Sequence, residues 1–169
     1  MGIDLTCDTK YFSCSYSGWN SARTELIEAT FFYLEDLIDK QTNDMVNDEY
    51  KNAFFNNLKK YINDIRQYRD SNNCLLFGFI ETSKNLNFIN LLIQFGVGGI
   101  YALCNKSDCE GFYSVGNSCD ICQLIKLIKP FLLKNKDDVD NQNLLYNSID
   151  RLLEVFQDSV ETNIIVSIT

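Results

Sequence analysis

The chain is organised around an apolar stretch, FINLLIQFGVGGIYALC at residues 88–104, which begins the segment from Phe88 to Leu133. Residues 85–95 are apolar on nearly every side, and this pattern predicts a central helix that its neighbours cover. Gly96, Gly98 and Gly99 follow directly. Because glycine has no side chain, these residues allow a sharp turn or a close helix crossing. We therefore expect a helical core at this point of the chain.

Outside this stretch, apolar residues recur every three or four positions in several segments, as they do in amphipathic helices. The clearest of these helices is predicted at residues 50–69, and others are predicted at residues 20–40, 118–132 and 141–158. Residues 74–80 fit a buried strand and a short helix equally well, so both interpretations stay open. The sequence thus predicts a mostly helical protein.

Both ends of the chain carry the signature of β-strands. Residues 3–7 alternate between apolar and polar side chains, and residues 11–16 form a second run after a short break, which predicts a β-hairpin. Residues 162–168 are rich in β-branched side chains and predict a final strand that pairs with this hairpin. The predicted fold class is therefore α+β and predominantly helical. It has about five or six helices and a small antiparallel sheet formed by the N-terminal hairpin and the C-terminal strand.

Composition limits the class of protein. The chain has 169 residues, of which 46% are hydrophobic and 22% charged, and we expect one globular domain over residues 1–169. The net charge of -8 disfavours nucleic acid and anionic membranes as partners, because both bind through clustered Lys and Arg. The sequence has no apolar run of membrane-spanning length and no signal-peptide pattern at its start, which predicts a soluble, cytoplasmic protein.

The chain contains no histidine. Ser-His-Asp and Cys-His nucleophile activation, general-base catalysis by His and every His-containing metal site are therefore excluded within this chain. Carboxylate, thiolate and backbone chemistry are what the sequence can still support.

Four of the seven cysteines lie close together in the sequence, spaced C-x4-C-x9-C-x2-C. Four thiolates can hold a zinc ion, and a C-x2-C pair at a helix start often supplies two of them. However, the chain also places cysteines elsewhere as small core residues, so we interpret the four as structural thiols and expect no cofactor, with zinc as the alternative. The four candidates are Cys104, Cys109, Cys119 and Cys122.

A polar loop follows the apolar stretch and gathers several side-chain oxygens. Such oxygens could bind a small ligand, although the spacing lacks the acidic first and last positions of an EF-hand. The simpler interpretation is a turn whose side chains accept hydrogen bonds from backbone amides. The residues of this candidate ligand loop are Asn105, Ser107, Asp108, Glu110 and Ser114.

The same loop resembles a known sequence block. Residues 105–111 read Asn-Lys-Ser-Asp-Cys-Glu-Gly and are followed by Ser114, which is similar to the block N-H-S-D-C-[DE]-G-x-x-S of small, uncharacterised, mostly bacterial proteins. Lys106 stands where that block has His, so the resemblance does not carry over any role of the imidazole. It implies that the loop is a site and implies no particular activity.

Three hypotheses for the function follow. We favour a non-catalytic domain that binds a protein partner, because no complete catalytic constellation is visible. The alternatives are a module stabilised by zinc on four cysteines, and a carboxylate-based enzyme or small-ligand binder that uses Asp108 and Glu110. A large exposed apolar patch would favour the first, four converging sulfur atoms the second, and a pocket lined by these acids the third.

Overall fold

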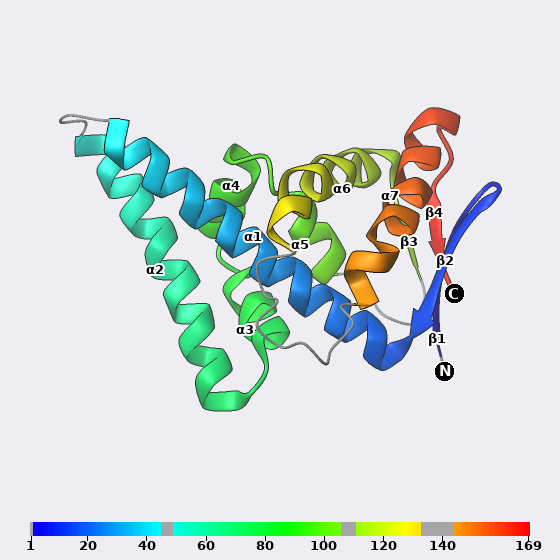
Figure 1. Ribbon diagram of the computed structural model, residues 1–169, viewed down its shortest axis with the longest axis horizontal. Helices are drawn as coiled ribbons and strands as arrows, with labels where there is room; N and C mark the ends of the chain where they lie inside the picture. Colours follow the sequence, from blue (N-terminus) through cyan, green and yellow to red (C-terminus); the bar gives the residue numbers. More distant parts are fainter. Residues whose placement is uncertain (1, 45–48, 106–110, 133–143) are drawn as a thin grey trace.

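The sheet lies at one end of the molecule and the helices lie on one side of it (Figure 1). The computed structural model describes residues 2–44, 49–105, 111–132 and 144–169. In this part of the chain the fold is α+β and 74% helical, with seven α-helices and four strands. The predicted fold class is thus confirmed.

The sheet is antiparallel, with the strand order β2-β1-β4-β3. Strand β1 pairs with β2 along its whole length and with β4 at Leu5 and Thr6. Asp4 and Thr169 add two backbone hydrogen bonds of 2.9 and 3.0 Å. The prediction that both chain ends share one sheet is therefore confirmed. The strands are β1 (Gly2–Cys7), β2 (Lys10–Ser15), β3 (Gly111–Tyr113) and β4 (Val166–Ile168).

The longest helix, α1, crosses the molecule from the sheet to the opposite end. There it meets the start of α2, whereas α7 lies beside the sheet (Figure 1). The helices are α1 (Tyr16–Asp44), α2 (Glu49–Asn72), α3 (Leu75–Thr82), α4 (Leu86–Gln94), α5 (Gly99–Cys104), α6 (Val115–Ile128) and α7 (Leu144–Thr162), with a 3-10 turn η1 at Lys129–Phe131.

Several element boundaries differ from the prediction. Helix α1 begins at Tyr16, before the expected start near Asn20, because the Ser15 hydroxyl accepts a hydrogen bond of 3.0 Å from the Gly18 amide and caps the helix. Of residues 74–80, for which strand and helix were both open, residues 75–80 belong to α3 and Cys74 precedes it in extended conformation. At the other end, α7 continues to Thr162 and the strand covers only 166–168. Asn163, with φ of 59°, ends α7 in the left-handed conformation.

The glycines after the apolar stretch make the predicted close crossing. A Cβ atom on Gly99 would lie 2.5 Å from the backbone oxygen of Asp120 and 2.8 Å from the Cα of Ile121. Helix α5 therefore begins directly against the backbone of α6. Gly96 has φ of 73° and makes the turn that separates α4 from α5.

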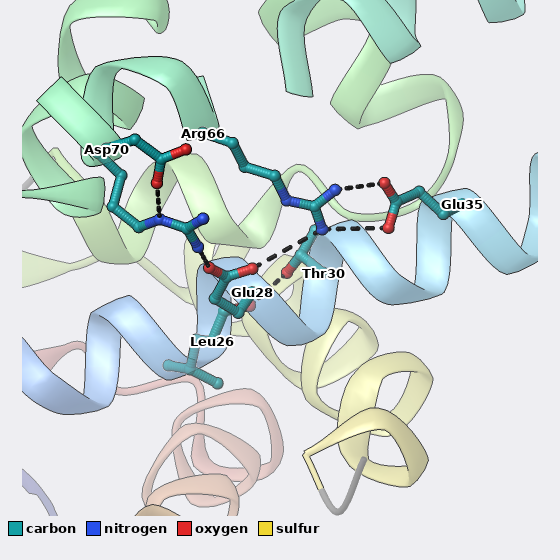
Figure 2. A network of polar contacts seen from close by, with 7 residues as sticks. Leu26, Glu28, Thr30, Glu35, Arg66 and Asp70 are labelled. Carbon is teal, nitrogen blue, oxygen red and sulfur yellow. Dashed lines mark hydrogen bonds and ion pairs between the residues drawn. The ribbon is translucent and has the colours of Figure 1, made fainter. Parts of the chain in front are cut away.

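Helix α2 is held on α1 by an apolar face and an ionic network. Leu58, Ile62 and Ile65 are fully buried, which confirms the predicted face. Beside them, the Arg66 guanidinium donates to Glu35 on α1, with a second bond of 3.1 Å, and Arg69 donates to Glu28 at 2.6 Å (Figure 2). These side chains are partly exposed, so the network contributes orientation more than stability.

Candidate functional site

The candidate ligand loop is described only at its two ends. Asn105 is exposed just after α5, and its side chain donates a hydrogen bond of 3.2 Å to the Tyr101 carbonyl. Ser114 caps α6, because its hydroxyl accepts from the Asn117 amide at 3.1 Å while the Asn117 side chain accepts from the Ser114 amide. Both side chains thus close helix ends. Ser107, Asp108 and Glu110 lie outside the described residues, so their role as ligand donors stays a prediction.

The cysteines of the zinc hypothesis are described in part. Cys104 is buried at the end of α5, and on α6 Cys119 is exposed while Cys122 is buried. In the described ranges no three Cys, Asp or Glu side chains are arranged to hold a metal ion. Cys109 lies outside these ranges, so the complete set of four sulfur atoms stays a prediction.

The shifted pKa values of three thiols and one carboxyl favour their neutral forms. Burial raises the pKa of the Cys7, Cys14 and Cys122 thiols, and it raises the pKa of the Glu25 carboxyl on α1. One Glu25 oxygen is buried and accepts no hydrogen bond. A nucleophilic thiolate needs a lowered pKa. The raised pKa values of these three thiols therefore disfavour a role as catalytic nucleophile.

A shallow depression lies between α1 and η1. It has a volume of about 360 Å³ and is lined by Tyr33, Asp36, Leu37, Lys40 and Phe131. The Tyr33 and Phe131 rings pack edge to face at 5.8 Å, and Lys40 forms an ion pair of 2.7 Å with Asp36. The two charged groups that line the depression therefore neutralise each other, and its apolar walls show no acid and base poised for catalysis.

Helix α4 departs most clearly from expectation. Residues 85–95 were predicted to be covered on all sides, and this prediction is wrong: Leu86 is 73% exposed and Ile93 is 60% exposed. Among the described residues, only one face of α4 is packed, with Phe88 in ring contact with Tyr61 of α2 at 5.1 Å and with Phe79 of α3 at 5.8 Å. The helix lies at the periphery of the molecule (Figure 1). Its opposite face is therefore open.

The open face of α4 carries a continuous apolar line. Leu86, Ile89 and Ile93 are spaced i, i+3 and i+7, which places them on one side of a helix; we call these three residues the α4 stripe. Ile89 is half-buried at its border. No charged residue occurs between Lys84 and Lys106. The stripe is thus apolar and lies on an uncharged helix.

The two ends of α4 are fixed. The Asn85 side chain accepts a hydrogen bond of 2.9 Å from the Asn87 amide and donates one of 3.1 Å to the Tyr61 hydroxyl. After the helix, the Phe95 amide donates to the Leu91 carbonyl at 3.1 Å. A capped, packed helix presents its open face in one conformation, so a partner would bind the stripe at little cost in ordering it.

No family model, curated protein or solved structure matches this chain. The similarity of the 105–114 block to uncharacterised proteins therefore stays a prediction. In the described part of the chain, no helix is long and apolar enough to cross a membrane. Helix α4, with nine residues, cannot be interpreted as a membrane span.

Two other exposed apolar side chains lie on a more ordinary surface. Tyr11 of β2 and Phe112 of β3 project from the outer face of the sheet. Their cross-strand neighbours are Thr6 and Ser167, so polar residues separate them, as is usual where one face of an antiparallel sheet meets water. The α4 stripe has no such interruption along its line.

The sequence did contain a signal for the open side of α4. Asn87, Asn90 and Gln94 are amides at positions i, i+3 and i+7, and a helix covered on every side rarely carries a row of polar groups. This row marks the solvent side next to the stripe. The apolar residues alone could not separate the packed face from the open one.

Proposed function

We propose that the protein is a non-catalytic interaction domain, and that the α4 stripe binds an apolar, uncharged surface of a partner polypeptide. The observation that carries this proposal is that Leu86 and Ile93 are 73% and 60% exposed on one side of a fixed helix. Large apolar side chains that lie in line on one side of a helix are normally covered. A partner that covers the open side would remove this conflict.

Covering the α4 stripe contributes free energy to binding. Full burial of a Leu or Ile side chain stabilises by about 1.5–3 kcal/mol. Covering the two exposed side chains would therefore contribute about 2–4 kcal/mol to binding. This is enough to anchor an interface whose surrounding contacts exclude water.

The chemistry of the helix defines the partner's surface. A charged group placed against the stripe would lose its hydration and gain no counter-charge, because residues 85–105 carry none. The matching surface is therefore apolar at its centre, with uncharged hydrogen-bonding groups beside Asn90. A helix or groove of another folded protein provides such a surface.

Site-specific photo-cross-linking tests the proposal. A photoreactive phenylalanine analogue is placed at Ile93, and a matched one at Tyr11, which is 72% exposed on the sheet. After irradiation in a lysate of the native host, we expect a protein adduct at position 93 that is lost on Leu86→Asn and kept on Tyr11→Asn. The proposal fails if position 93 gives no protein adduct, or if Leu86→Asn leaves the adduct unchanged.

A further inference from the structure

We infer that the partner of the α4 stripe is a second copy of this chain, and that two α4 helices pack antiparallel about a twofold axis near Ile89 and Asn90. This inference rests on the proposed function and uses the same surface. It assigns that surface an occupant and a geometry.

The first argument is electrostatic. The chain has a net charge of -8, so two copies repel each other wherever acidic surfaces meet. Residues 85–105 carry no charge. Contact through α4 therefore brings two copies together without charge repulsion between their residues 85–105.

The second argument is that the polar groups of α4 are complementary to themselves. A carboxylate or an ammonium group repels its own copy, whereas an amide both donates and accepts hydrogen bonds and can pair with an identical amide. Asn87, Asn90 and Gln94 flank the stripe. In a twofold interface each patch meets its own copy, and a row of amides satisfies that requirement.

The third argument is the symmetry of the stripe. Leu86 and Ile93 lie at equal distances along the helix from the midpoint between Ile89 and Asn90. In an antiparallel pair, Leu86 therefore lies against the partner's Ile93, and the reverse contact forms at the other end. Asn90 then lies near the axis at the edge of the apolar seam, where its amide can pair with the same amide of the second copy. The antiparallel arrangement also opposes the two helix dipoles.

The interface is small. Helix α4 has nine residues, so it is about 13 Å long. Two such helices bury less than the roughly 1,200 Å² of standard interfaces, which is the range of weak, transient association. The dimer is therefore reversible, with a dissociation constant on the order of 100 µM.

Sedimentation equilibrium on the full chain tests the dimer. We expect wild-type protein to pass from monomer to dimer between about 10 µM and 1 mM. The double variant Leu86→Lys with Ile93→Lys places lysine against lysine and weakens association at least 10-fold. Tyr11→Lys, at an equally exposed position, leaves association unchanged. All three sites are solvent-exposed, and circular dichroism confirms that each variant is folded.

A charge-swap variant tests the geometry. Leu86→Lys combined with Ile93→Glu restores association in an antiparallel pair, because each introduced lysine meets an introduced glutamate, whereas a parallel pair places like charges together. Wild-type protein that stays monomeric at 1 mM overturns the inference, as does a dimer that the double-lysine variant does not weaken. If the adduct at position 93 contains a different polypeptide, self-association fails while the proposed function stands.

Discussion

Replacement of Gly99 by alanine tests the packing on which the central helices depend. The added methyl group would lie 2.5 Å from the Asp120 oxygen and 2.7 Å from its carbonyl carbon. Both atoms belong to the backbone of α6, so no side-chain rotation can relieve the contact and α5 has to move away from α6. Overpacking of this kind costs about 1–3 kcal/mol.

The expected loss includes a smaller opposing effect. Alanine restricts the unfolded chain more than glycine does, and this favours the folded state by about 0.4–1 kcal/mol. Because the clash is with backbone, we take the upper part of the overpacking range and expect Gly99→Ala to destabilise the protein by about 1–2.5 kcal/mol. With an m value of about 2 kcal/mol per molar, the midpoint of urea unfolding falls by about 0.5–1 M.

Gly116 provides the matched control. It also lies in the first turn of a helix, but a Cβ atom there would meet only the Ser114 hydroxyl oxygen at 3.7 Å. Gly116→Ala should therefore raise the midpoint slightly, by the same unfolded-state effect. If Gly99→Ala left the midpoint unchanged or raised it as Gly116→Ala does, the close crossing of α5 and α6 would be refuted.

Four further predictions follow from the packing and the titratable groups. Leu58→Ala and Ile62→Ala should each cost about 2–5 kcal/mol in urea unfolding, and a loss below about 1 kcal/mol at both would contradict the buried face of α2. Truncation after Val160 removes β4, the strand that joins β1 to β3, so the far-ultraviolet dichroism of the whole domain should be lost rather than trimmed. Burial raises the pKa of Glu25, so this group favours the folded state below its unfolded pKa and loses that contribution as pH rises through its folded pKa. Glu25→Gln should therefore stabilise the protein more at pH 7 than at pH 4. Equal effects at the two pH values would argue against a raised pKa. If the central thiols are structural, purified protein should carry no stoichiometric zinc and a chelator should not lower its melting temperature, whereas one equivalent of zinc lost on Cys119→Ser would establish the alternative.

Local patterns predicted the elements whose signal is contained in their own residues. Alternation at residues 3–7 places Ile3 and Leu5 on the buried face, and the three-to-four spacing at residues 50–69 defines the packed face of α2. Both signals arise because one side of the strand or helix is buried and the other side is exposed to solvent.

Elements whose state depends on distant neighbours could not be predicted in this way. Strand β3 has only three residues, too few to show alternation, and it exists because β4 pairs with it. The open side of α4 depends on which of its faces α2 and α3 happen to cover. For the candidate loop, the sequence favoured a turn with local hydrogen bonds to the backbone, and Asn105 and Ser114 make such bonds at the end of α5 and the start of α6.

The strand order has a consequence for how the protein is made. Strand β1 is synthesised early, but its second neighbour, β4, lies at residues 166–168. At about 5–20 residues per second, the hairpin waits on the order of ten seconds or more with one edge of β1 unpaired. During that interval a neighbouring nascent chain can pair with the same edge. A chaperone that shields extended segments should therefore raise the yield of correctly folded protein. The gain should be larger than for a protein of the same helix content whose strands are neighbours in the sequence.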